Sequence, residues 1–144
     1  MAYGYGITLA EAEAVANAAL AEGRRQGFPP LGVAVLDPGG HPVVVKRDDG
    51  ATFFRITVAW GKAWGALAMG VSSRGLGERL GDRPLFLQAL SDLAGGRMVP
   101  VAGGLLIWRQ GQLVGAVGVS GATSDQDEDA ARAGIAAAGL SAEP

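Results

Sequence analysis

Residues 115–127 read Gly-Ala-Val-Gly-Val-Ser-Gly-Ala-Thr-Ser-Asp-Gln-Asp and lead from a predicted strand into a predicted helix. Thr123 or Ser124 suits the N-cap of that helix, whose first turn is acidic, as the helix dipole favours. Phosphate-binding loops also join a strand to a helix, but this stretch matches neither the P-loop nor the GxGxxG pattern. The carboxylates from Asp125 to Asp129 would also repel a phosphate there. We therefore expect a tight turn with close packing of the helix against the sheet.

The sequence before this stretch predicts two β-hairpins. Residues 104–109 and 113–119 are apolar runs joined by a tight turn around Gln110-Gly111. Residues 31–36 and 41–47 form the other pair, joined by a turn of sequence Asp-Pro-Gly-Gly. Strands that are joined as adjacent hairpins predict an antiparallel sheet.

Helical periodicity predicts the layers around this sheet. Residues 9–26 follow a capping box, residues 53–70 place apolar side chains on one face, and an alanine-rich helix runs to Ala138. Residues 71–97 predict only short helical starts, which glycines interrupt. The predicted fold class is therefore α+β, with helices against an antiparallel sheet, in a single domain of residues 1–144.

The composition indicates extensive burial. Of the 144 residues, 49% are hydrophobic and only 18% are charged, which excludes a disordered chain. A monomer of this composition would expose apolar patches, so part of the burial is expected between subunits of a homo-oligomer. The 24 glycines recur inside apolar segments, and Gly61 and Gly65 leave a flat stripe on the second helix where another backbone can approach.

Charge and residue usage exclude several classes of function. The net charge is −2 and no basic run exceeds Arg24-Arg25, so we expect no nucleic-acid-binding surface. The absence of cysteine excludes disulfides, thiolate metal sites and cysteine nucleophiles. A single histidine, His41, excludes a multi-histidine metal cage within one chain.

The N-terminal residues predict a location. They lack the basic region and apolar core of an export signal, so we expect the protein in the cytoplasm. The apolar runs 63–71 and 101–108 are shorter than the roughly 20 residues that a membrane-spanning helix needs.

Three polar positions carry candidate chemistry. His41 is either an axial ligand to haem iron, a general base, or a histidine at the edge of a strand. Arg47, beside two aspartates, either anchors an anionic ligand or ties a loop to the sheet. Lys62 lies on a strongly apolar helix, where it is either a ligand-binding or reactive amine or extends to solvent.

Several large apolar side chains also allow two interpretations. They line a flat pocket for an aromatic or tetrapyrrole ligand, or they fill the core, as residues at helical and strand spacing more often do. The side chains are Trp60, Trp64, Trp108, Met69 and Met98.

Taken together, several segments resemble the GlcG/HbpS-like family of haem-binding proteins across nearly the whole chain. The most specific is residues 115–127, which combine a glycine-rich strand, a Val-Ser-Gly turn and a Gln-Asp pair. The others are Val35-Leu-Asp-Pro-Gly-Gly-His41, Arg47-Asp-Asp-Gly-Ala51, Lys62-Ala63 and Gly103-Gly104. The family resemblance implies a profilin-like α+β fold and compact oligomers. Its members include an extracellular haem-binding redox accessory protein, glycolate-operon proteins, and a domain fused to cobalamin adenosyltransferases.

The resemblance also implies site residues. His41, Arg47, Asp49 and Lys62 match family positions and are expected to form the polar lining of a pocket. Gly103, Gly104, Gly118 and Gly121 are expected to shape the backbone around it. The chain departs from the family pattern where Leu106 replaces a proline, and in aromatic bulk around the second helix, from Phe53, Phe54, Trp60 and Trp64.

Three functions follow from these residues. The first is a binding protein for haem or a related tetrapyrrole. The second is an enzyme that acts on a small carbonyl or carboxylate metabolite, with Lys62 or His41 as proton shuttle and Arg47 or Asp49 positioning the substrate. The third is a structural or accessory subunit without a small ligand, whose tryptophans fill the core and interfaces.

Overall fold

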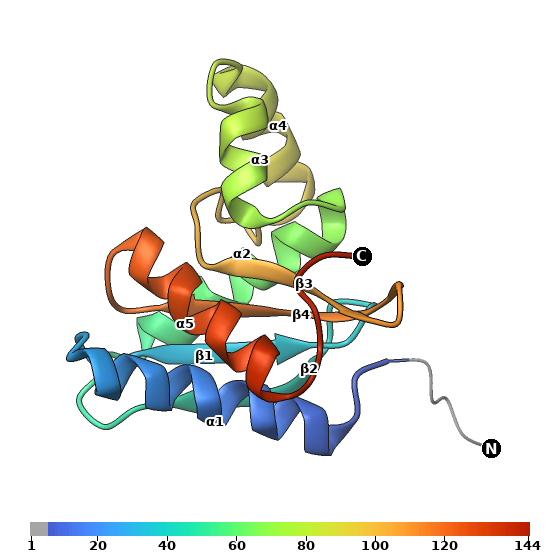
Figure 1. The fold of residues 1–144 in the computed structure, drawn as a ribbon. Helices are drawn as coiled ribbons and strands as arrows, with labels where there is room; N and C mark the ends of the chain where they lie inside the picture. The colour runs from blue at the N-terminus through green and yellow to red at the C-terminus, as the bar shows by residue number, and fades with distance from the viewer. Residues whose placement is uncertain (1–5) are drawn as a thin grey trace.

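The computed structural model describes residues 6–144 (Figure 1). Residues 1–5, part of the N-terminal stretch that was expected to lack an export signal, lie outside the described part. The elements follow one another in the order α1 (Leu9–Gln26), β1 (Gly32–Leu36), β2 (Pro42–Arg47), α2 (Phe54–Met69), α3 (Ser73–Leu80), α4 (Pro84–Leu93), β3 (Gly104–Arg109), β4 (Gln112–Ser120) and α5 (Ser124–Ala137).

The four strands form one antiparallel sheet with the order β2-β1-β4-β3. Each predicted hairpin contributes two neighbouring strands, and β1 joins the hairpins by pairing with β4, where Val35 lies opposite Val117. The predicted α+β class with an antiparallel sheet flanked by helices is confirmed. The predicted bounds of the first helix are also confirmed, as is its capping box.

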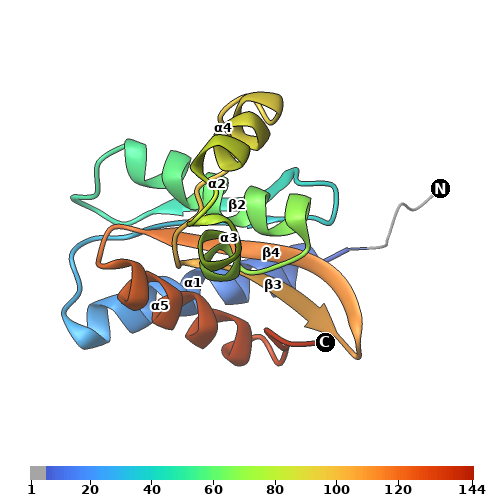
Figure 2. The same cartoon turned by 90° about the horizontal axis from the view of Figure 1, so that it is seen from above.

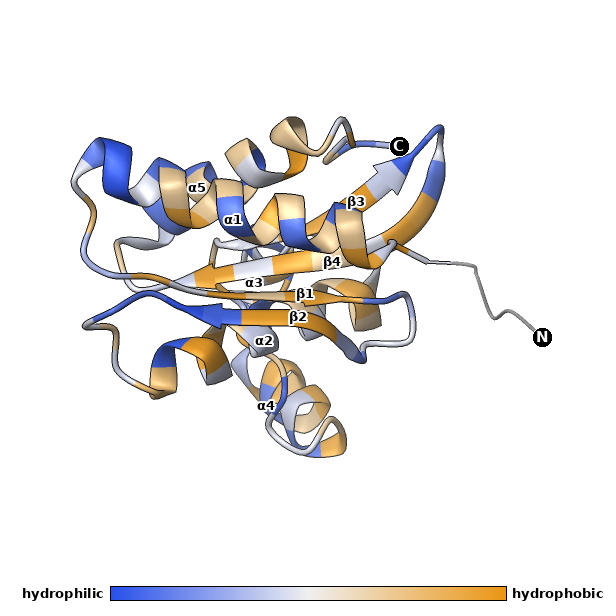
Figure 3. Cartoon of the chain, turned by 90° about the horizontal axis from the view of Figure 1, so that it is seen from below, coloured by the Kyte–Doolittle hydropathy of each residue, from blue (hydrophilic) through white to orange (hydrophobic). Residues whose placement is uncertain are grey.

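Helices cover both faces of the sheet (Figures 1 and 2). α1 and α5 lie side by side on one face, and α2 crosses the other. The core under α1 and α5 contains Val33, Val35, Val117, Val119 and Ile135, among others. The core under α2 is built from smaller residues: Ala34, Leu36, Ala59, Ala63, Ala66, Leu106 and Ala116. Apolar side chains of the central strands therefore pack on both faces of the sheet. Figure 3 shows that apolar residues dominate these strands.

The middle of the chain folds into two short helices that extend away from the sheet. The predicted short helical starts are α3, whose N-cap Ser72 accepts the Gly75 N–H, and α4, which begins at Pro84. They pack around a separate apolar cluster of Leu76, Leu80, Ala94 and Met98. Across residues 6–144, none of the helices combines the length and apolarity needed to cross a membrane.

Glycines set how closely α2 approaches the sheet. A Cβ on Gly118 of β4 would overlap the carbonyl oxygen of Ala59 in α2. The predicted flat stripe on the other side of α2 is also occupied, because Gly61 meets Val99 and Gly65 meets Met98 of the segment that follows α4. Backbone therefore lies against α2 on two sides.

The two kinds of glycine contact predict opposite effects of alanine. Gly118→Ala should lower the free energy of unfolding by about 3 kcal/mol or more, because two backbones must separate to admit the methyl group. In the matched control Gly65→Ala, the nearest atoms are at an ordinary 3.5 Å, and alanine favours a helix by about 1 kcal/mol, so stability should hold or rise. Urea denaturation measures both variants. A Gly118→Ala variant of unchanged stability would contradict the close packing of α2 on β4.

Candidate functional site

A cavity of about 820 Å³ lies between α2, the turn that joins β1 to β2, and the loop after α4. Its volume is within the range of small-molecule sites, about 300–1,000 Å³. The residues that line it are Gly39, Gly40, His41, Val45, Phe54, Ile56, Thr57, Val58, Trp60, Gly61, Trp64, Gly95, Gly96, Arg97 and Val99. The side chains are mostly apolar, and within this lining the ionisable ones are His41 and Arg97.

Two tryptophans form the floor of the cavity and part of the core at once. Trp60 and Trp64 are half-buried, pack against the apolar cluster under α2, and also line the cavity. These two tryptophans therefore fill part of the core, and they also line a cavity; that this cavity takes an aromatic or tetrapyrrole ligand stays a prediction. Trp108 packs at the edge of the same cluster, and Met69 and Met98 pack around the α3–α4 cluster, so these three lie outside the cavity lining.

A tight turn presents His41 at the cavity. Asp37 Oδ1 accepts the Gly39 N–H at 2.9 Å and the His41 N–H at 3.1 Å, and it lies 3.6 Å from His41 Nδ1. Gly40 has a φ of 83°, and a Cβ there would lie 3.0 Å from the indole of Trp64. The turn therefore rests on the floor of the cavity. The imidazole is 80% exposed, and its Nδ1 faces the Asp37 carboxylate, which leaves Nε2 available to a ligand.

Arg97 is the second ionisable side chain of the cavity. Its guanidinium lies 4.6 Å from the ring centroid of Trp64, and its Nε donates to the Ala94 carbonyl at 2.7 Å. A guanidinium held in this way keeps donors for a carboxylate while it stacks on an aromatic floor. Arg97 was not among the site residues predicted from the sequence. The signal available was the preceding Gly95-Gly96, which brings the chain back toward α2, but nothing in the sequence assigns the arginine to this cavity.

The other predicted polar residues lie outside the cavity lining. Arg47 and Asp49 are exposed at the end of β2 and in the turn after it. Asp48, between them, accepts from Arg24 of α1 at 2.9 Å, so this segment ties the loop to a helix. A role of Arg47 and Asp49 in ligand binding stays a prediction.

Lys62 points into the protein and not into the cavity. It is 2% exposed, and its Nζ lies 2.9 Å from Asp127 Oδ2 and 3.0 Å from the Val119 carbonyl oxygen. Asp127 Oδ1 accepts the Ala122 N–H at 2.9 Å. The expectation that Lys62 extends to solvent is therefore wrong. The amine is held in a buried ion pair that joins α2 to the start of α5.

Two of the predicted backbone-shaping glycines, Gly103 and Gly104, pack against Lys62. A Cβ on Gly103 would lie 2.8 Å from Lys62 Nζ, and a Cβ on Gly104 would overlap the Lys62 carbonyl. Gly121, with a φ of 143°, lies against Pro30. These glycines make room for the buried lysine and for the turn between β4 and α5.

Burial raises the pKa of the Asp127 carboxyl, and the Lys62 ammonium opposes that rise. The hydrogen bond from Ala122 also favours the charged form, but desolvation is the largest effect. The ion pair is therefore costly to break, because either partner alone is a buried charge.

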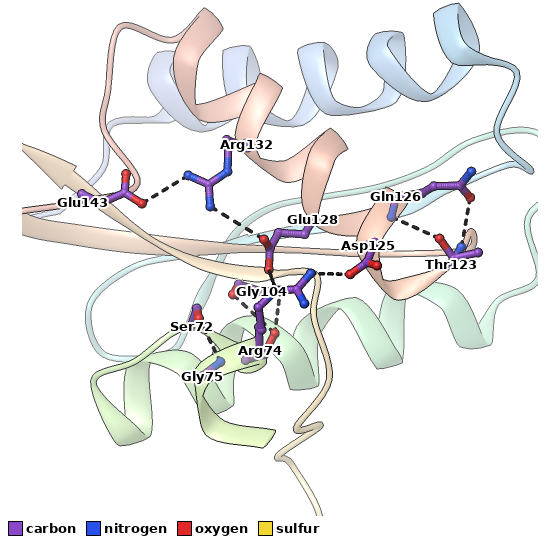
Figure 4. A network of polar contacts seen from close by, with 11 residues as sticks. Ser72, Arg74, Gly75, Gly104, Thr123, Asp125, Gln126, Glu128, Arg132 and Glu143 are labelled. Atoms are coloured by element: carbon purple, nitrogen blue, oxygen red, sulfur yellow. Dashed lines mark hydrogen bonds and ion pairs between the residues drawn. The ribbon is translucent and has the colours of Figure 1, made fainter. Parts of the chain in front are cut away.

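A second, smaller cavity of about 320 Å³ lies between α3, α5 and the C-terminal residues, and paired charges surround it. Arg74 bonds Asp125 and Glu128, and Arg132 lies 3.7 Å from Glu128 and 3.2 Å from Glu143 (Figure 4). Because these ion pairs are partly exposed, each one alone contributes little to the free energy of unfolding. As a network they connect α3, α5 and the C-terminal residues. Each arginine already faces carboxylates, unlike Arg97.

Comparison with known proteins identifies the family of this chain. The model of the family described as "Haem degrading protein HbpS-like" matches residues 7–136. The chain belongs to this family. The predicted resemblance is thus confirmed over most of the HbpS-like chain.

Individual relatives differ in length. The corrinoid adenosyltransferase PduO of Salmonella typhimurium is 33% identical over 108 residues, which cover 75% of this chain but 32% of PduO. This chain therefore spans about a third of that relative. A 15.0 kDa protein from the dhaT-dhaS intergenic region of Citrobacter freundii, of uncharacterized function, is 31% identical over 84% of each chain.

Solved structures share the fold. PduOC in complex with haem is 28% identical, with a TM-score of 0.86 over 96% of this chain and 99% of that one. A double mutant of HbpS from Streptomyces reticuli is 32% identical, with a TM-score of 0.81 over 94% of this chain and 89% of that one. The HbpS-like chain therefore has the architecture of a protein crystallised with haem.

The buried ion pair predicts how a variant responds to pH. Lys62→Met should lower the free energy of unfolding by about 3–5 kcal/mol at neutral pH, because it leaves the Asp127 carboxylate buried and unpaired. Without Lys62 the pKa of Asp127 rises further, so the folded state binds a proton that the unfolded state releases. The variant should therefore regain stability as the pH falls, until the pH reaches the ordinary aspartate value of 3.8.

Urea denaturation at pH 8 and at pH 5 measures the difference in free energy of unfolding between Lys62→Met and the unsubstituted protein. The control is Lys62→Met with Asp127→Asn, in which the pH-dependent part of the difference should disappear. If Lys62→Met loses the same free energy at both pH values, Asp127 is not the group that titrates.

Proposed function

We propose that the protein binds haem, or a related flat tetrapyrrole with carboxylate groups, in the 820 Å³ cavity over α2. The observation that carries the proposal is the composition of this cavity: two indole rings, one imidazole and one guanidinium. The walls favour a flat apolar ligand, and the two charged or titratable groups lie where they can reach different parts of it. The residues present fit haem for these reasons.

Each residue has a distinct part in the proposed site. Trp60 and Trp64 exclude water from the face of the macrocycle, and Arg97 pairs with a propionate. His41 offers Nε2 to the iron, and Asp37 orients the ring from the Nδ1 side. Bound haem would supply ligand-exchange and electron-transfer chemistry, and the chain would supply apolar affinity, one ligand and one counter-charge.

The comparisons support this class of ligand. A structural relative was crystallised with haem, and the family carries the description of haem-degrading proteins. We also infer that the chain acts as one domain in a homo-oligomer, as its composition predicts, and that this oligomer is cytoplasmic. The cytoplasmic location is tested by fractionating the cells that produce the protein.

A haem titration followed by absorbance tests the proposal. The unsubstituted protein should give a saturable Soret band, and His41→Ala should shift that band and weaken binding, because the iron loses its protein ligand. Size-exclusion chromatography of both proteins controls for folding. A saturable band that is identical in His41→Ala would remove His41 from the site, and no saturable band in either protein would overturn the proposed function.

The Arg97 contact predicts dependence on the carboxylates of the ligand. Arg97→Gln should weaken haem binding about tenfold, since a hydrogen bond to a charged group is lost. The matched control Arg47→Gln removes an exposed arginine outside the cavity lining and should bind like the unsubstituted protein. With haem dimethyl ester, which has no free carboxylate, Arg97→Gln should show no loss. An equal loss for Arg47→Gln would instead restore Arg47 as the anion contact.

A further inference from the structure

The cavity over α2 has a polar end and an apolar end. At the polar end, the Arg97 guanidinium lies 4.6 Å from the ring centroid of Trp64. The turn that carries His41 meets the same indole, because a Cβ on Gly40 would lie 3.0 Å from it. Phe54 lines the cavity at the start of α2. At a rise of about 1.5 Å per residue, Phe54 and Trp64 lie about 15 Å apart along the helix, a length comparable to the width of a tetrapyrrole.

The apolar end contains Phe54 and Val58 of α2, and Val45 of β2 beyond the His41 turn. Phe54 is 57% exposed and Val45 is 36% exposed, so the protein without ligand presents apolar surface to water there. Arg55 follows Phe54, but its Cβ lies against Gly32 of β1, and it is not part of the cavity lining. A ligand edge at this end therefore covers apolar side chains and meets neither of the ionisable groups in the lining.

Haem has the same polarity as the cavity. Both of its propionates extend from one edge of the macrocycle, and vinyl and methyl groups occupy the opposite edge. With a propionate on Arg97, the opposite edge lies over Phe54 and removes its exposed ring from water. A tetrapyrrole with further propionates in place of the vinyl groups would bring carboxylates onto this apolar surface, where they lose hydration without gaining a cationic partner.

We propose that Phe54 fixes the orientation of haem in the cavity and makes the site selective for tetrapyrroles that carry carboxylates on one edge only. The propionate edge faces Arg97, and the vinyl edge covers Phe54 and Val45. Phe54 is therefore a specificity-determining residue of the site. This inference rests on the proposed haem binding, and it adds the orientation of the ligand and the class of tetrapyrrole that the cavity accepts.

Absorbance titrations with two iron porphyrins test the selectivity. One is protohaem, and the other is iron coproporphyrin III, which carries propionates in place of both vinyl groups. The unsubstituted protein should bind protohaem more tightly by about tenfold or more, because the two additional carboxylates lose hydration at the apolar end. Equal affinities would overturn the proposal, and would assign the additional carboxylates to the Thr57 hydroxyl or to the backbone N–H groups at the start of α2.

Phe54→Lys tests the residue itself. It should weaken the binding of protohaem and strengthen that of iron coproporphyrin III, so the ratio of the two affinities should fall by about tenfold or more. The matched control is Phe53→Lys, which adds the same charge at a neighbouring residue that is 75% exposed and outside the cavity lining. It should leave the ratio unchanged. Because the two porphyrins differ in solubility in the same way for every variant, a change in the ratio reports on residue 54. Circular dichroism establishes that both variants fold.

The outcomes separate this inference from haem binding as such. If both porphyrins bind and the ratio is the same in Phe54→Lys as in the unsubstituted protein, the role of Phe54 is overturned while the haem site stands. An equal change of the ratio in Phe53→Lys would show a general effect of charge and would also overturn that role. If neither porphyrin gives a saturable band, the proposed haem site fails, and the inference fails with it.

Discussion

The close contact of α2 with β4 is the constraint on which the rest of the structure depends. Gly118 allows the two backbones to touch, and the small core residues under α2 keep the helix near the sheet along its length. Lys62 then reaches through this layer to Asp127 at the start of α5. One buried ion pair therefore links the helix on one face of the sheet to a helix on the other face, with β4 between them. A larger residue at Gly103, Gly104 or Gly118 would displace the helix and separate the pair.

The same contact explains why a cavity forms where it does. Because Ala59, Ala63 and Ala66 face the sheet, the larger Trp60 and Trp64 are turned sideways and outward from the same helix. The β1–β2 turn and the Gly95–Val99 segment approach the two indole rings from two sides. Neither segment covers the rings, so a cavity remains between them. The buried face of α2 is thus responsible for the tight packing, and its outer face provides an open aromatic surface.

Sequence patterns predicted the helices and strands well, because the signals for a helix cap, a strand or a turn lie in residues that are close together in the sequence. The Thr8 and Thr123 caps, the apolar strands and the glycine turns are local signals, and the structure places elements where these signals lie. The candidate site was less accessible. His41 lies at the cavity, as predicted, but Lys62 faces the protein interior. Helical periodicity predicts that an apolar helix packs against the core, but it does not predict whether the one lysine of that helix faces the core or the cavity. The family resemblance gave Lys62 as part of a polar pocket lining and the glycines as backbone-shaping positions. In the structure Gly103 and Gly104 pack against Lys62, whereas Gly118 packs on Ala59 and Gly121 on Pro30.

Arg97 shows why long-range placement escapes sequence reasoning. It follows α3 and α4, which form their own small core and are separated from α2 by a stretch without periodicity. Its position over Trp64 depends on the length of that excursion and on the left-handed conformations of Gly95 and Gly96, with φ of 66° and 78°. These glycines turn the chain back so that Val99 can lie on Gly61, and Arg97 is carried to the cavity by that contact. The α3–α4 segment therefore has two effects: it leaves α4 exposed, and it places the Arg97 guanidinium at the cavity.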